Sequence, residues 1–204
     1  TSESDEGFTV TLSSPSAGSV ITAIANGIIR NDDPSSNFTK ISAIQGSGAA
    51  SALANNGNSY IVQGMLTGCQ PAKHGITWND TFRADAGYVK TTTCFEIAKA
   101  AGLETAMFVG KSKLQHIAKP NTVDEFQVIQ DGAGPISTAA AAYFTTHKPG
   151  LMFVHHPDPD AAGHSKGWGS PEYRAALENC DKALGDLLAA LEASGVADKT
   201  VVIV

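Results

Sequence analysis

The chain has 204 residues, of which 42% are hydrophobic and 17% charged, so it can bury the core of one α/β domain and is not a disordered polymer. The formal net charge is −6 and no run of Lys or Arg occurs, which argues against a basic patch for nucleic acid or for an anionic membrane. No apolar run approaches the roughly 18–20 residues that a membrane span requires.

The N-terminal region is predicted to hold few regular elements. Residues 1–7 are acidic and are expected to form a disordered tail. Phe8–Ser13 has the pattern of a strand, and Ala17–Asn26 has the pattern of a short helix that a following glycine can end. The polar stretch 31–40 is expected to be a surface loop.

From Ser59 onward, helix and strand patterns alternate. The helical patterns lie at Ser59–Leu66, Thr93–Ala101, Ile136–His147 and from Ser170, as N-cap, to about Ser194. The strand patterns lie at Thr105–Val109, Asp124–Ile129, Gly150–His156 and Thr200–Val204. This alternation predicts one α/β domain over residues 1–204, with a mostly parallel central sheet covered by helices on both faces. Because functional loops follow the carboxyl ends of such strands, we expect more chain to follow Val204 in the natural protein.

Val154–Ser165, which reads VHHPDPDAAGHS, gathers ionisable side chains at the end of a predicted strand. Pro157 and Pro159 are expected to stop a helix here. Asp160 and His164 stand four residues apart, so a tight turn can direct one oxygen and one nitrogen at the same point, a ligand mix that suits zinc. The alternative is that these residues are turn formers and solvated polar groups. The neighbouring side chains that share the stretch are His155, His156 and Asp158.

Three stretches together resemble the alkaline phosphatase superfamily, in its type I phosphodiesterase/nucleotide pyrophosphatase branch. They are MLTGCQPAKHGITWN at 65–79, DAAGH at 160–164 and SPEYRAALENCDKALGDLLAAL at 170–191, which runs on into DKTVVIV. The similarity covers about residues 59–204. It implies an alkaline-phosphatase-like core that lacks its C-terminal part.

The resemblance also implies a chemistry. Family members carry two zinc ions that bind a phosphoryl group and activate a Thr or Ser nucleophile, in a two-metal clamp on the attacking and leaving oxygens. Asp160 and His164 match the Asp and His of the D-x-x-G-H motif that binds one zinc. Asn79 matches the Asn of an H-G-I-x-x-N pattern that donates to a phosphate oxygen. Asn37 and Asn79 each begin an N-glycosylation triplet, which is compatible with a secreted or extracytoplasmic protein. We expect Asn79 to be unglycosylated if it binds phosphate.

The chain departs from the family pattern at the nucleophile. That position falls on Asn58, whose amide cannot attack phosphorus, and Ser59 could replace it only if the turn were rebuilt. Of the family's zinc ligands other than the nucleophile, only Asp160 and His164 are present, whereas catalytic zinc ions usually keep three protein ligands. The side chains of His155, His156 or Asp158, or a second chain, are the remaining sources of a third ligand.

These observations favour a zinc-dependent phosphoric ester or diester hydrolase by descent, with a small phosphate ester as substrate. The alternative is a catalytically inactive descendant that binds a ligand or a protein partner, as the loss of the nucleophile would suggest. A third interpretation is that the activity resides in a longer protein of which this is a fragment. Cys69, Cys94 and Cys180 form no C-x-x-C pair and predict no redox or zinc-ribbon motif.

Overall fold

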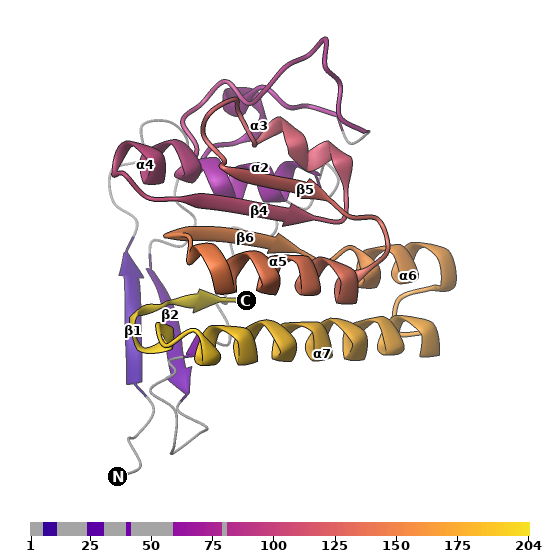
Figure 1. Cartoon of the computed structure of the whole chain (residues 1–204). Coiled ribbons are helices and arrows are strands. Elements are labelled where there is room, and N and C mark those ends of the chain that lie inside the picture. Colours follow the sequence, from indigo (N-terminus) through magenta and orange to yellow (C-terminus); the bar gives the residue numbers. More distant parts are fainter. Residues whose placement is uncertain (1–5, 12–23, 31–39, 42–58, 79–80) are drawn as a thin grey trace. The chain divides into compact units, whose positions relative to one another are not determined.

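The computed structural model describes residues 6–11, 24–30, 40–41, 59–78 and 81–204 (Figure 1). The chain divides into two compact units, one formed by Gly57–Ser194 and the other by Thr1–Asn56 with Gly195–Val204. The single domain expected from the sequence therefore stays a prediction.

The unit Gly57–Ser194 is built on a parallel sheet with the strand order β5-β4-β6. The strands are β4 (Thr105–Val109), β5 (Glu125–Val128) and β6 (Leu151–His155). All five residues of β4 are buried, because β4 has a neighbour on each side and helices over both faces. A strand buried on both faces has a continuous apolar sequence, which is why its position was predictable.

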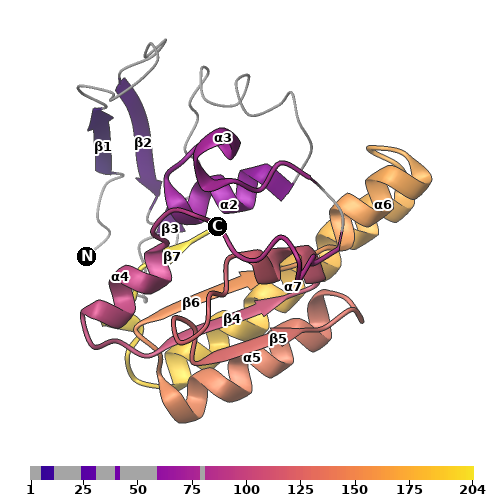
Figure 2. The same ribbon diagram turned by 90° about the horizontal axis from the view of Figure 1, so that it is seen from above.

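Helices cover both faces of this sheet, as Figures 1 and 2 show. On one side lie α2 (Ser59–Thr67), α3 (Pro71–His74) and α4 (Cys94–Ala100). On the other side lie α5 (Ala133–His147) and α7 (Pro171–Ala193). The predicted α/β class, a parallel sheet flanked by helices on both faces, is confirmed for this unit.

Alternate residues of β4 divide the core into two apolar clusters, because successive side chains of a strand point to opposite faces. Met107 and Val109 pack with a cluster that contains Ile76, Val89, Phe95, Leu114 and Ile117. Ala106 and Phe108 pack with Ile136 and Ala140 of α5 on the opposite face, where Leu187 of α7 also makes contact. Both clusters consist of residues from Gly57–Ser194 alone.

Helix starts follow local capping rules. Thr93 and Glu96 form a reciprocal capping box at α4, and the Ser170 hydroxyl accepts from the Tyr173 amide ahead of Pro171 at α7, as predicted. Helix α5 begins at Ala133, earlier than the predicted Ile136, because Pro135 falls in its first turn, where a missing N–H is tolerated. The described residues also include the short 3-10 helices η1 (Ser112–His116) and η2 (Ala197–Lys199).

The second unit holds a four-stranded sheet with the order β1-β2-β3-β7. Its strands are β1 (Glu6–Thr11), β2 (Ile24–Arg30), β3 (Lys40–Ile41) and β7 (Val202–Ile203). β1, β2 and β3 are joined by antiparallel pairing, and β3 pairs with β7 in parallel.

Two predictions for this unit are wrong where the structure describes them. The helix expected over Ala17–Asn26 is wrong at its end, because Ile24–Asn26 belong to β2 and pair with β1. The disordered tail expected over residues 1–7 is wrong for Glu6 and Gly7, which pair with Ile29 and Ile28. In both cases a partner strand distant in sequence decides the conformation, and local pattern does not report it.

Candidate functional site

The Asp- and His-rich stretch after β6 forms a helix, α6 (Asp158–Lys166), and not the predicted tight turn. Pro157 is the N-cap residue and Pro159 lies in the first turn, where the absent N–H breaks no helical hydrogen bond. Asp158 and Asp160 also lie in the first turn, where carboxylates interact favourably with the helix dipole. The two prolines therefore start a helix here and do not prevent one.

The helix brings Asp160 and His164 together on one face, because residues four apart are neighbours on a helix surface. Asp160 Oδ1 and His164 Nε2 are 3.5 Å apart. The Asp160 side chain is 25% exposed and that of His164 is 67% exposed, so the pair is open to solvent on the histidine side. The predicted proximity of these two groups is observed, although by a different local structure.

Gly163, between the two, lies under the indole of Trp168. A Cβ atom at this position would be 2.4 Å from Trp168 Cε3, which is closer than atoms can approach. The Trp168 ring in turn meets the His164 imidazole edge-on, with ring centroids 5.5 Å apart. The glycine of the D-x-x-G-H motif thus admits an aromatic ring that also contacts His164.

Lys111, which follows the carboxyl end of β4, donates a hydrogen bond from its ammonium group to Asp160 Oδ2. The preceding residue explains the approach. Gly110 N–H donates to the carbonyl of His155 at 3.2 Å, and a Cβ at Gly110 would lie 2.3 Å from Pro157 Cγ. The loops after β4 and β6 therefore pack directly on each other, and Lys111 is brought over α6.

Lys111 contributes to a lowered pKa of the Asp160 carboxyl group. Burial by itself raises the pKa of this carboxyl group, but the hydrogen bond and the charge of Lys111 outweigh burial, so the pKa is lowered. His155 responds in the same direction, because burial and then the Lys111 charge lower its pKa to about 4. At neutral pH Asp160 is thus ionised and His155 is neutral.

His155, His156 and Asp158 are the three side chains considered as a third ligand, and each has a different local environment. His156 Nε2 shares a hydrogen bond with Ser137 Oγ at 2.9 Å, on α5. Asp158 Oδ1 lies against Gly132, where a Cβ would be 2.7 Å away, and Asp158 Oδ2 is buried without a hydrogen-bond partner. His155 Nδ1 is likewise buried without a hydrogen-bond partner.

The other predicted site residues lie at or beyond the limits of the described chain. Asn58 and Asn79 fall outside the described residues. Ser59 is the first residue of α2, and its side chain is outside the described part. His74, in the matched 65–79 stretch, is fully buried, and its Nδ1 accepts from the Ile76 amide at 3.2 Å, which is the role of a structural turn residue.

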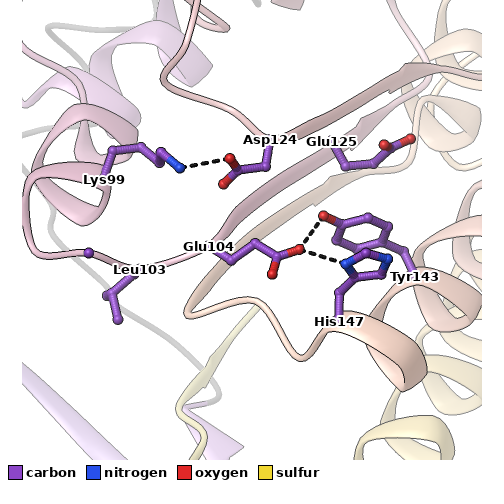
Figure 3. A pocket seen from close by; sticks show the side chains of 8 residues that line it. Lys99, Leu103, Glu104, Asp124, Glu125, Tyr143 and His147 are labelled. Atoms are coloured by element: carbon purple, nitrogen blue, oxygen red, sulfur yellow. Dashed lines mark hydrogen bonds and ion pairs between the residues drawn. The ribbon is translucent and has the colours of Figure 1, made fainter.

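A pocket of about 610 Å³ lies at the opposite, amino ends of β4 and β5 (Figure 3). Its wall holds Glu104, which accepts from the Tyr143 hydroxyl at 2.5 Å and contacts His147 Nδ1 at 2.8 Å. Ligands of parallel α/β sheets bind beyond the carboxyl ends of the strands, and neither Asp160 nor His164 lines this pocket.

Comparison with known proteins identifies the family. A model of the family "type I phosphodiesterase / nucleotide pyrophosphatase" matches residues 64–204, well over half of the chain and including the whole D-x-x-G-H motif. The chain belongs to this family. It is thereby placed in the alkaline phosphatase superfamily, and the resemblance seen in the sequence is confirmed.

Solved structures of the family share the fold. Two structures of murine ectonucleotide pyrophosphatase/phosphodiesterase 5, one of them an inactive variant in complex with AMP, match with a TM-score of 0.54 at 18% identity. Each match covers 69% of this chain and 41% of the other, so the chain spans about two fifths of the length of these family members. No curated protein sequence matches the chain.

Asp160 and His164, which the sequence resemblance matches to two zinc ligands of the family, both lie among the described residues. Asp160 and His164 have the donor atoms that zinc prefers and stand side by side. Among the residues that the structure describes, however, no group of three or more His, Cys, Asp or Glu side chains is arranged to hold a metal ion. The pair therefore fits zinc in chemistry, and further ligands are not found in the described part.

Sequence reasoning missed Lys111. The signal for it is topological, because the loops after neighbouring parallel strands meet at one edge of the sheet, and β4 and β6 are neighbours with Val109 opposite His155.

In the described chain, no helix combines the length and apolar character needed to cross a bilayer. Cys69, Cys94 and Cys180 all carry free thiols.

Proposed function

We propose that the chain is the core of a zinc-dependent phosphoric diester hydrolase of the type I phosphodiesterase/nucleotide pyrophosphatase kind. The observation that supports this is the pairing of Asp160 and His164 on α6, directly after the carboxyl end of β6 and inside the span that the family matches. The substrate is a small phosphate ester. AMP is the first ligand to test for binding, because a murine relative forms a complex with AMP.

In this proposal Asp160 and His164 hold one zinc ion and Asn79 donates to a phosphate oxygen. Zinc bound there would supply a Lewis acid that stabilises negative charge on phosphate oxygens. Asp160 contributes a carboxylate whose pKa is raised by burial but lowered overall by the hydrogen bond and charge of Lys111. Trp168 packs against Gly163 and contacts the His164 ring, which restricts where the imidazole can turn. Ser59, at the start of α2, is the hydroxyl nearest in sequence to the family nucleophile position.

The second candidate is an inactive descendant that binds a phosphate ester or a protein partner without cleaving it. Asn58 at the family nucleophile position favours this candidate, since an amide does not form the phosphoryl-enzyme bond. We also propose that a second chain completes the metal site and that the protein is secreted. The first proposal rests on the incomplete ligand set among the described residues. The second rests on the glycosylation triplets at Asn37 and Asn79.

Hydrolysis of bis(4-nitrophenyl) phosphate by the 204-residue chain tests the proposal. We expect turnover with added zinc, loss of turnover with a chelator and loss of turnover in Asp160→Ala. Zinc should also raise the melting temperature of the unaltered chain and not that of Asp160→Ala, because a metal bound only to the folded state adds to stability. Asp186→Ala, an exposed carboxylate on α7, is the matched control and should behave like the unaltered chain.

The outcomes separate the two candidates. Zinc-dependent turnover that Asp160→Ala removes supports the hydrolase. A folded sample with no turnover, in which AMP still raises the melting temperature, supports the inactive descendant. A zinc-induced shift of equal size in Asp160→Ala would exclude Asp160 as a metal ligand, and with it the proposed Asp160–His164 pair.

A further inference from the structure

We propose that Lys111 is an internal competitor for the metal ion. Its ammonium group donates a hydrogen bond to Asp160 Oδ2. This hydrogen bond has to break before a divalent cation can bind to the same oxygen. This inference rests on the proposed function in one respect, namely that Asp160 and His164 are metal ligands. It adds a residue that neither the family motif nor the zinc chemistry assigns.

The contacts of Asp160 carry the inference. Lys111 Nζ donates to Asp160 Oδ2, while His164 Nε2 stands 3.5 Å from Oδ1. The side chains of Lys111 and Asp160 are each 25% exposed, so solvent screens their attraction less than it screens an ion pair on the open surface. A cation that approaches this carboxylate therefore meets a positive charge already held there.

The position of Lys111 is fixed by the backbone. The contact of Gly110 with Pro157 and the hydrogen bond from Gly110 N–H to the His155 carbonyl join the loop after β4 to the start of α6. Lys111 is the next residue after Gly110. Its backbone is consequently held beside the first turn of α6, and only the flexible side chain has to move for the ammonium group to leave the carboxylate.

Lys113 provides a matched control, because it stands two residues further along the chain, at the start of η1, and also acts on Asp160 through its charge. Lys111→Met and Lys113→Met remove the same formal charge and keep a side chain of similar length. If positive charge near Asp160 opposes metal binding whatever its source, the two variants should change zinc affinity alike. If the hydrogen bond from Lys111 matters, Lys111→Met should have the larger effect.

Equilibrium dialysis of the 204-residue chain against zinc, with bound metal measured by mass spectrometry, tests the inference without an activity readout. We expect Lys111→Met to bind zinc about tenfold more tightly than the unaltered chain, the factor that corresponds to losing one charge-assisted hydrogen bond. Lys113→Met should change the affinity less. In an Asp160→Asn background, Lys111→Met should have no effect. Lys111→Gln replaces Lys111→Met if circular dichroism shows that the latter is not folded.

Two outcomes would overturn the inference, and they differ in what they say about the proposed function. If Asp160→Asn weakens zinc binding but neutral Lys111 variants bind no more tightly than the unaltered chain, the metal site stands and Lys111 is not a competitor. If Asp160→Asn leaves zinc binding unchanged, the metal assignment and the competition fail together.

Discussion

Gly163 shows how a single missing side chain shapes the candidate site. The indole of Trp168 occupies the space above it, and the same ring contacts the imidazole of His164 edge-on. Trp168 is itself 62% exposed, so this packing does not serve to bury the ring. Gly163 thus leaves room for the Trp168 ring, which contacts the candidate metal ligand His164.

Gly163→Ala should destabilise the protein, because the new methyl group would overlap the Trp168 ring and force it to move. We expect a loss of about 1–3 kcal/mol in the free energy of unfolding, as for other insertions into packed contacts. Urea denaturation followed by tryptophan fluorescence measures it. Gly185→Ala on α7 is the control, because a Cβ there meets nothing within 4 Å, and it should stabilise the helix by roughly 0.5–1 kcal/mol. Equal effects of both substitutions would contradict the role given to Trp168.

Among the secondary-structure elements, Asp124 joins α4 to the starts of β4 and β5 (Figure 3). Its carboxylate accepts from Lys99 Nζ at 2.7 Å and from the Thr105 amide at 2.8 Å. The hydrogen bond from Lys99, followed by that from the Thr105 backbone, lowers the pKa of Asp124. One side chain thereby connects a helix end with two strands.

Asp124 should make stability depend on pH in the acid range. Because the folded protein holds its pKa below that of the unfolded chain, about 3.9, the contribution is present above that value and is lost as pH falls through the folded pKa. Asp124→Asn should therefore be less stable than the unaltered chain at pH 7, and the difference should shrink toward pH 3. Urea denaturation at both pH values measures it. A difference that stays constant with pH would remove Asp124 from the acid response.

Helices and strands that have a clear apolar pattern or capping residue of their own were predictable from the sequence. Elements whose conformation depends on a partner distant in sequence were not. β4 and β6 are continuous apolar runs, and α7 begins at a Ser-Pro pair, so pattern and capping suffice. α6 was missed because Pro157 and Pro159 also fit a turn, and the choice depends on whether a helix can begin there. β2 was missed because its pairing with β1 overrides its local pattern.

At the scale of the whole chain, residues 57–194 should fold without the rest. Both apolar clusters, and the helices on both faces of the β5-β4-β6 sheet, lie within this span. We expect a 57–194 polypeptide to unfold in one cooperative transition, with circular dichroism and fluorescence of its two tryptophans giving the same midpoint. Divergent midpoints, or binding of a hydrophobic dye in the absence of urea, would show that this span depends on the other residues.

The candidate site was predictable in the same uneven way. The Asp160–His164 pair is visible in the sequence, because its two members are four residues apart and belong to a family motif. Lys111 is not visible, since its contact with Asp160 joins residues 49 positions apart through the edge of a folded sheet. The order of the strands in the sheet brings Lys111 to Asp160, and local sequence does not report that order.

The placement of Asp160 and His164 on successive turns of α6 has a consequence for coordination. Folding of the helix has already fixed the spacing of the two side chains, so under the proposed metal binding they would act as one chelating arm. Once either atom binds an ion, the other meets it at a high effective concentration, and the second bond needs little further ordering. Such an arm can keep affinity for a cation in a chain whose remaining ligands have changed. Descent from a metalloenzyme would then leave a trace in ion binding even where catalysis had been lost.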